Sequence, residues 1–384
     1  MTRRAPVGGP DFAATGGCPT RLERTVMQPL AHARWTARPL PVHLVGSLPH
    51  PLCDDPATAL GWVLRHVDGV PLTALPCDRD PRWIIDWLTH DLAAVPALDQ
   101  VRGGESKGYH DMPYYRVRPG CRLDPDDVAF GRLEQADAAF AALEAVEADR
   151  PLRLQIGIPN ALDLAMFAFG PEAAREWMPV VQAAVVGEVA RVAARWGDRV
   201  QFQLESPAVL VSYHRTPRSH WPELTAELTR QVAGVLGAAP DARWVLHLCY
   251  GDLEHVPVFE PEDLEAPVEF LNGLADVLAE RRLPMPTVHL PVTSGDGPPS
   301  VDPVFFAPLR HLRRGVDVIV GVVAEAHPGA TRQALELAAD ALGGPIAGVA
   351  AACGYGRRTV DAAAANVELA VELAREWSPV PERG

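Results

Sequence analysis

Arg243-Trp244-Val245-Leu246-His247-Leu248 is a short, mostly apolar run, and Cys249-Tyr250-Gly251-Asp252 follows it directly. The run predicts a buried β-strand over Arg243–Leu248, and the polar side chains after it mark the carboxyl end of that strand. His247 and Cys249 are two residues apart, so on extended backbone their side chains point to the same side.

Seven further runs of this kind occur along the chain, with amphipathic stretches between most of them. The runs are Pro41–Gly46, Val70–Leu75, Leu152–Gly157, Val200–Leu204, Pro286–Leu290, Val316–Val322 and Pro345–Ala350. The helical stretches include Pro171–Trp196, Trp221–Leu236, Pro267–Arg281, Thr331–Leu342 and Val360–Trp377. Strands that alternate with helices indicate a parallel sheet, and eight such units fit a closed barrel better than an open sheet. The sequence therefore predicts an α/β fold, a single (β/α)₈ TIM barrel over residues 39–380.

Two segments do not follow this alternation. Residues 1–38 are rich in Arg, Pro, Gly and Ala and contain no apolar stretch typical of a secretory signal. We expect them to form an N-terminal extension, either loose or an arm over a neighbouring subunit of an oligomer. Asp78–Arg150, after the second strand, is too long for one helix and contains the aromatic, polar run Tyr109–Arg116. A segment of this length is either a cover over an active site or a structural insertion packed against the barrel.

The composition limits the class of protein. With 384 residues, 48% of them hydrophobic, the chain can bury a large core. The net charge of −14 argues against a nucleic-acid partner, and no run approaches the roughly 20 apolar residues that cross a membrane. Six cysteines are too few for a disulfide scaffold. A cytoplasmic enzyme is the class that these properties favour.

Polar side chains gather where the expected strands end. In a barrel of this type the catalytic groups come from the carboxyl ends of the strands. The residues concerned are Ser47, Glu205, His247, Cys249, His289, His327 and Cys353. A His-x-Cys pair alone is a weak metal signal, because a histidine at a strand end is more often a hydrogen-bonded core residue. With Cys353 at the same rim, however, the set has the imidazole and thiolate ligands that suit zinc.

Four motifs together resemble the catalytic half of the cobalamin-independent methionine synthase family. They occur in the family's order and cover nearly all of the chain. They are Val45-Gly46-Ser47-Leu48-Pro49, Gln203-Leu204-Glu205-Ser206-Pro207-Ala208, His247-Leu248-Cys249-Tyr250 and Cys353-Gly354-Tyr355-Gly356-Arg357-Arg358. The combination is much more specific than any one motif.

The resemblance implies a zinc-dependent methyl or alkyl transferase. In that family zinc binds a thiol substrate as thiolate, because a bound cation lowers the pKa of the thiol. The partners implied are a small thiol and a methyl donor. Carried over to this chain, the ligands are His247, Cys249 and Cys353. Ser47 and Glu205 correspond to positions that hold the amino-acid part of the thiol.

Two more site residues have expected roles. His327 lies close to the position of a histidine proposed as the family's proton donor, which makes it, with Glu205, a candidate catalytic residue. Tyr250 is a candidate for stacking on a flat substrate.

The sequence departs from the family in two ways. The family's glutamate ligand at the end of the sixth strand is replaced by Pro291, and His289 stands two residues earlier on the same strand face. His289 is therefore a candidate fourth ligand, a substrate contact or a hydrogen-bonding residue of the barrel interior. The chain also has only one barrel where the synthase has two, which leaves folate, a corrinoid protein and other donors open.

Three other functions are compatible with the same residues. One is a zinc-dependent enzyme that forms or breaks a C–S bond in another small thiol. The second is a metal-free decarboxylase-like relative, although the paired Asp and Arg residues of those enzymes are not visible here. The third is a thiol-binding or metal-binding protein without catalytic activity, because fold analogy does not settle the reaction.

Overall fold

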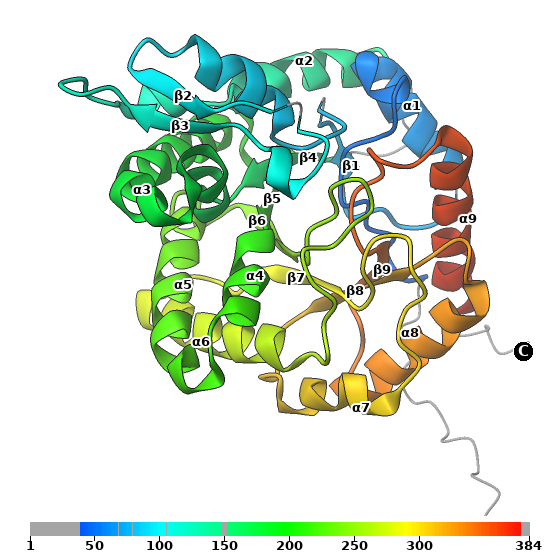
Figure 1. Ribbon diagram of the computed structural model, residues 1–384. Helices are drawn as coiled ribbons and strands as arrows, with labels where there is room; N and C mark the ends of the chain where they lie inside the picture. The colour runs from blue at the N-terminus through cyan, green and yellow to red at the C-terminus, as the bar shows by residue number, and fades with distance from the viewer. Residues whose placement is uncertain (1–38, 68, 79, 105, 147–151, 378–384) are drawn as a thin grey trace, which may run out of the picture. The chain divides into compact units, whose positions relative to one another are not determined.

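The computed structural model describes residues 39–377 apart from residues 68, 79, 105 and 147–151 (Figure 1). The expected N-terminal extension, residues 1–38, lies outside the described residues.

The centre of the fold is a curled, seven-stranded parallel sheet. Its strands, in spatial order, are β1 (Leu75–Pro76), β4 (Leu154–Pro159), β5 (Val200–Ser206), β6 (Arg243–Leu248), β7 (Thr287–Pro291), β8 (Val318–Val323) and β9 (Gly348–Ala351). Every residue of β4, β5, β8 and β9 is buried, as expected for parallel strands covered on both faces. Consecutive strands of the chain are neighbours throughout this sheet.

The two ends of the sheet are linked through Val42. Val42 forms parallel bridges with Leu72 and with Val349 of β9. The Val42 amide donates to the Pro71 carbonyl at 2.8 Å, and the His43 amide donates to the Val349 carbonyl at 2.9 Å. The segment around Val42 therefore lies between the chain just before β1 and the last strand of the sheet.

Two of the expected strands are shorter than the sequence predicted. Pro41–Gly46 contributes only the bridging residue Val42, and Val70–Leu75 contributes a bridge at Leu72 and the start of β1. Pro41 and Pro71 lack the amide hydrogen that a longer ladder needs, which explains the interruption. Where the sequence predicted eight regular strands, the described residues form a seven-stranded sheet and one bridging segment.

Helices follow the strands and cover the outside of the sheet (Figure 1). They are α1 (Pro56–His66), α2 (Arg132–Glu144), α3 (Ala161–Trp196), α4 (Pro207–Arg215), α5 (Trp221–Leu236), α6 (Glu265–Arg281), α7 (Pro303–Phe306), α8 (Pro328–Leu342) and α9 (Val360–Glu376). The bounds of α5 are those predicted, because Pro222 suits a helix start and Leu228, Val232 and Leu236 form one buried face. At α9 the Thr359 side chain accepts a hydrogen bond from the Ala362 amide and caps the helix.

Helix α3 begins ten residues earlier than the expected start at Pro171 and is kinked at Gly170. Gly170 has φ 77° and ψ 162°, a conformation that is essentially restricted to glycine. The following proline disfavours helical backbone at this position, so two helical pieces meet here. Residues 161–199 are long and apolar enough to cross a membrane by length and composition only, and the core helix of a soluble protein can have the same length and composition.

The insertion after β1 forms an irregular layer with one hairpin. Its strands β2 (Leu98–Arg102) and β3 (Tyr114–Val117) are antiparallel, and α2 follows them. The buried Tyr115 donates a hydrogen bond to the Leu88 carbonyl at 2.5 Å, and β3 contacts α3. The insertion is therefore packed against the rest of the fold.

Replacing Gly170 by Ala should lower the free energy of unfolding by about 1–3 kcal/mol, because a side chain there strains the backbone. The added Cβ would also meet the ring of Tyr114 at 3.4 Å. Urea denaturation measures the change. The matched control is Gly187→Ala in the same helix, where the nearest atom belongs to the flexible Arg191 side chain. This control should be neutral or stabilising by up to about 1 kcal/mol, and equal effects of the two changes would contradict the assignment of strain.

Candidate functional site

Three potential metal ligands meet at the carboxyl ends of β6 and β9. One ligand atom from each of His247, Cys249 and Cys353 lies within 4.8 Å of the other two. The two sulfur atoms are 3.8 Å apart, and His247 and Cys249 are buried. Two thiolates bound tetrahedrally to zinc, each at about 2.3 Å, would be separated by ~3.8 Å, so the spacing fits the ion.

The two thiols do not share their protons equally. The hydrogen bond between the sulfurs lowers the pKa of Cys353 and raises the pKa of Cys249, because one thiol must act as donor to the other. Arg357 donates a hydrogen bond to the Cys353 sulfur at 3.3 Å, and its charge favours the thiolate further. The Gly251 amide donates to the Cys249 sulfur at 3.3 Å. Each sulfur therefore accepts one N–H hydrogen bond that favours its thiolate form, and the net effect is a lowered pKa at Cys353 alone.

The Arg357 guanidinium is held in place by Asp252. The two side chains form an ion pair at 2.8 Å, and the Asp252 side chain is 1% exposed. Burial alone would raise the pKa of Asp252, but the His255 ring, 3.7 Å away, and the charge and hydrogen bond of Arg357 outweigh it, and the pKa lies below its usual value. Asp252 is therefore a carboxylate that fixes Arg357 beside Cys353.

His289 lies directly behind His247, on the adjacent strand. The two residues are register partners in β6 and β7, and their Nδ1 atoms are 2.7 Å apart. The other ring nitrogen of His289, Nε2, is 2.9 Å from the Ala351 carbonyl oxygen. Burial lowers the pKa of His289 well below its usual value, so the ring is neutral. The side chain is fully buried and is not among the residues that line the adjacent cavity.

Two carboxyl groups face each other near the metal-ligand set. A Cβ built on Gly157, on the strand between them, would lie 2.7 Å from the Asp78 carboxylate and 2.9 Å from that of Glu205. Burial raises the pKa of Glu205 to about 8, and the neighbouring charge of Asp78 adds to this effect. Burial also raises the pKa of Asp78, against the opposing charge of Arg132.

Each carboxyl group has hydrogen-bond donors that fix its position. The Trp83 indole donates to one Glu205 oxygen at 2.6 Å, and the Gln203 amide donates to the other at 2.9 Å. The Ser47 backbone amide points to Asp78 at 3.4 Å, and Ser47 also lines the cavity. The sequence indicated Ser47 and Glu205 but missed Asp78 and the hydrogen bond from Trp83 to Glu205. The only available signal for Asp78 was an acidic residue directly after the second strand.

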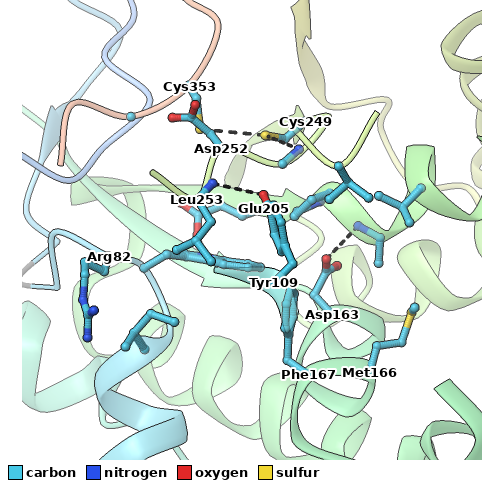
Figure 2. Close-up of a pocket in the computed structure, with 18 of the residues that line it drawn as sticks. Arg82, Tyr109, Asp163, Met166, Phe167, Glu205, Cys249, Asp252, Leu253 and Cys353 are labelled. Carbon is cyan, nitrogen blue, oxygen red and sulfur yellow. Dashed lines mark hydrogen bonds between the residues drawn. The ribbon is translucent and has the colours of Figure 1, made fainter. Parts of the chain in front are cut away.

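A cavity of about 190 Å³ is lined by Glu205 and by both cysteines (Figure 2), and Asp78 lies behind Glu205 outside its lining. Figure 2 shows Cys249 and Cys353 at one end of it and Met166 and Phe167 at the other. Tyr109 from the insertion extends across it, and its hydroxyl accepts a hydrogen bond from the Leu253 amide at 3.0 Å. The apolar part is completed by Met112, Tyr114, Val211 and Val258. The insertion therefore supplies part of the cavity wall in addition to packing against α3.

Two residues expected at the site lie elsewhere. The buried Tyr250 donates its hydroxyl hydrogen to the Pro291 carbonyl at 3.1 Å and packs edge-on against Phe259. It follows Cys249 directly, so its side chain points away from the ligand face and cannot stack on a ligand in this cavity. His327 stands directly before α8, beyond the end of β8, and is not a cavity-lining residue. Proximity to a strand end in sequence did not bring these side chains to the cavity.

A second group of potential ligands lies at the start of α1. It consists of His50, Cys53 and Asp54, of which His50 and Asp54 are exposed. The three residues are neighbours in sequence and sit on one short turn, so their proximity follows from local geometry alone.

No protein-family model matches the chain, and no curated protein is similar to it in sequence. Solved structures, however, are similar in fold. A B12-independent methionine synthase from Shewanella sp. W3-18-1, in complex with selenomethionine, has a TM-score of 0.57 at 13% identity over 88% of this chain and 97% of that one. A putative vitamin-B12-independent methionine synthase from Listeria monocytogenes has a TM-score of 0.51 at 13% identity with the same coverage. The chain thus shares the fold of B12-independent methionine synthases, which is the fold that its four motifs predicted.

Proposed function

We propose that the chain is a zinc-dependent methyltransferase that acts on a small thiol. The observation that carries the proposal is the convergence of His247, Cys249 and Cys353 in a fold shared with methionine synthases. We also propose that the fold is a (β/α)₈ barrel, in which the segment around Val42 serves as the eighth strand. The pairing of Val42 with both ends of the sheet supports this.

The residues fit the role of a catalytic zinc site. Three protein ligands leave a fourth position for substrate, as catalytic zinc sites commonly do. When bound, zinc supplies the positive charge that keeps a thiol ionised at neutral pH. Arg357 and the Gly251 amide direct hydrogen bonds at the two cysteine sulfurs, and the pKa of Cys353 is lowered by its hydrogen bond with Cys249 and in part by the charge of Arg357.

The carboxyl pair indicates what else the thiol carries. Asp78 and Glu205 repel one another when both are ionised, and an entering ammonium group would relieve that repulsion. We propose that the thiol is an amino acid and that these carboxylates bind its ammonium group, with Ser47 beside them. Homocysteine, whose S-methylation gives methionine, has the required groups.

The apolar end of the cavity supports the proposal that a methyl donor approaches the thiol from that side. Methyl transfer needs the donor carbon in line with the sulfur, and apolar walls exclude water from that path. Met166 and Phe167 from α3 and Tyr109 from the insertion provide such walls.

Cys249→Ser and Cys353→Ser should each lower zinc affinity at least tenfold, because each removes a ligand. Loss of a residue that only hydrogen-bonds to a ligand already lowers affinity about ten- to a hundredfold, and loss of the ligand itself is a larger change. Mass spectrometry of the metal content after dialysis against a chelator measures the change, and circular dichroism should show the fold retained. Cys121→Ser, at an exposed thiol of the insertion, is the matched control and should keep the wild-type content. Equal zinc in all four proteins would contradict the assigned ligands.

The zinc-loaded protein should convert homocysteine to methionine with a methyl donor. Methylcobalamin and methyltetrahydrofolate supplied in parallel assays distinguish the two donor types. Glu205→Gln should raise the KM for homocysteine and leave zinc content unchanged, because Glu205 is assigned to the ammonium group and not to the metal. Homocysteine lacking its amino group tests the same point from the substrate side, since the substitution should matter much less with it. An equal effect of Glu205→Gln on both thiols would contradict the ammonium site.

The buried carboxyl pair should also make stability depend on pH. The pKa of Glu205 is raised from 4.5 to about 8, so the folded state favours the protonated form. The unfolded chain releases this proton near pH 4.5, so the free energy of unfolding should fall as the pH rises from 4.5 to about 8. Glu205→Gln should flatten this dependence in urea titrations. Glu336→Gln, at an exposed position on α8, should leave the dependence as in the wild type.

A further inference from the structure

The hydrogen bonds of His289 fix which nitrogen carries its proton. Its Nε2 atom is 2.9 Å from the Ala351 carbonyl oxygen, and a carbonyl oxygen can only accept. Nε2 is therefore the donor nitrogen of the neutral ring, and Nδ1 carries the lone pair. That Nδ1 atom is 2.7 Å from Nδ1 of His247.

The same reasoning then determines the tautomer of His247. Because His289 Nδ1 accepts, His247 Nδ1 must donate. In the neutral form of the His247 ring, the remaining nitrogen Nε2 then carries the lone pair that a cation can bind. In this arrangement both ring nitrogens of His289 are in use, so His289 has no lone pair left for a metal.

We infer that His289 is a positioning residue, which holds His247 in the tautomer whose Nε2 binds the metal and is not itself a ligand. The inference rests on the proposed function for the metal, whereas the hydrogen-bond chain is independent of it. The hydrogen bonds run from His247 on β6 through His289 on β7 to Ala351 on β9, two residues before Cys353. These hydrogen bonds therefore connect β6, which carries His247 and leads to Cys249, with β9, which leads to Cys353.

The neighbouring residues restrict the orientation of the His289 ring. A Cβ on Gly321 of β8 would lie 2.7 Å from His289 Nε2, so glycine makes room for the ring. On another side the His43 ring lies 5.6 Å away, centroid to centroid. His43 is itself held by Gln203 at 2.9 Å and Thr73 at 2.8 Å. The packing thus prevents His289 from turning its ring toward the cavity.

The decisive measurement on the hydrogen bond between His247 and His289 is made on the protein without substitutions, and a variant serves only for signal assignment. Nitrogen-15 NMR of the histidine rings in the metal-free wild-type protein reports which nitrogen of His247 carries hydrogen. A His247→Gln protein assigns the signal. We expect hydrogen on Nδ1 of His247 and on Nε2 of His289. Hydrogen on Nε2 of His247 would overturn the inference even if the protein binds zinc.

Two substitutions test the consequence for the metal. His289→Phe keeps a ring but removes the acceptor, and zinc affinity, measured by competition with a chromophoric chelator, should fall about tenfold or more. His289→Asn can place its side-chain oxygen near the former Nδ1 position, so it should lose less than tenfold. His311→Phe, at an exposed histidine outside the site, is the matched control and should bind as the wild type does.

The outcomes separate this inference from the proposed function. If wild-type protein binds no zinc, the proposed function is wrong, and the NMR measurement still decides the hydrogen-bond chain. If the wild type binds zinc and His289→Phe binds it equally well, the positioning role is wrong and the ligand set stands. If the Asn and Phe variants lose affinity equally, with cobalt-substituted protein changing its d–d spectrum in both, His289 is a ligand and the inference is overturned.

Discussion

The register of the parallel strands is the constraint on which the site depends. Backbone pairing places Glu205 of β5 opposite His247 of β6, and His247 opposite His289 of β7. These three inward side chains therefore stand at one level, fixed by the hydrogen-bond ladder before any side-chain contact is considered. A slip of one residue would turn His247 to the outer face and bring the fully buried Leu246 or Leu248 inside. The apolar residues that cover the outer face thus also hold the site in register.

The interior below this level holds several buried polar side chains beside the apolar Val245 and Ile319, and each polar group depends on its neighbours. His43 hydrogen-bonds to Gln203, whose amide donates to Glu205, and Gln201 donates to Gln155. Barrel interiors of this type are usually filled by branched apolar side chains, which pack without directional demands. Here a substitution at one position leaves a buried partner without its hydrogen bond, at a cost of about 1–3 kcal/mol. The same hydrogen bonds give each polar side chain a single orientation. They therefore fix the positions of side chains from the centre of the fold to the carboxyl ends of the strands.

The sequence predicted those parts of the molecule that depend on local pattern. The bounds of β6 and α5 follow from apolar runs and periodicity, and the two-residue spacing of His247 and Cys249 placed them on one face. Their meeting with Cys353 needed the additional assumption of a closed arrangement of strands. Asp78 was not found, because its importance comes from Glu205, a residue far away in the chain. Contacts between an insertion and a distant strand leave no periodic signal in the sequence.

Tyr250 is a residue that the sequence indicated and the structure places away from the cavity. Its place beside Cys249 suggested a role in binding, yet alternation of side chains along extended backbone directs it to the other face. The role of His289 was harder to predict, because its position on the inward face of β7 is compatible with a metal ligand, a substrate contact and a structural residue. Only the hydrogen-bond partners of its two ring nitrogens distinguish these roles, and partners on other strands become known when the fold is known.

Charge balance explains how a site without a carboxylate ligand can suit a thiol substrate. In the proposed site two thiolates neutralise the zinc ion, and His247 adds no charge. A third thiolate from the substrate therefore gives an excess of one negative charge, where an additional carboxylate ligand would give two. Arg357 reduces this excess further through its hydrogen bond to Cys353, and its own charge is balanced by Asp252. Fewer negative charges around the metal hold a thiolate more tightly and make its sulfur less nucleophilic. Under the proposed function, a thiol substrate would then be retained firmly, and the fixed orientation of donor and acceptor in a cavity with apolar walls would have to supply more of the rate.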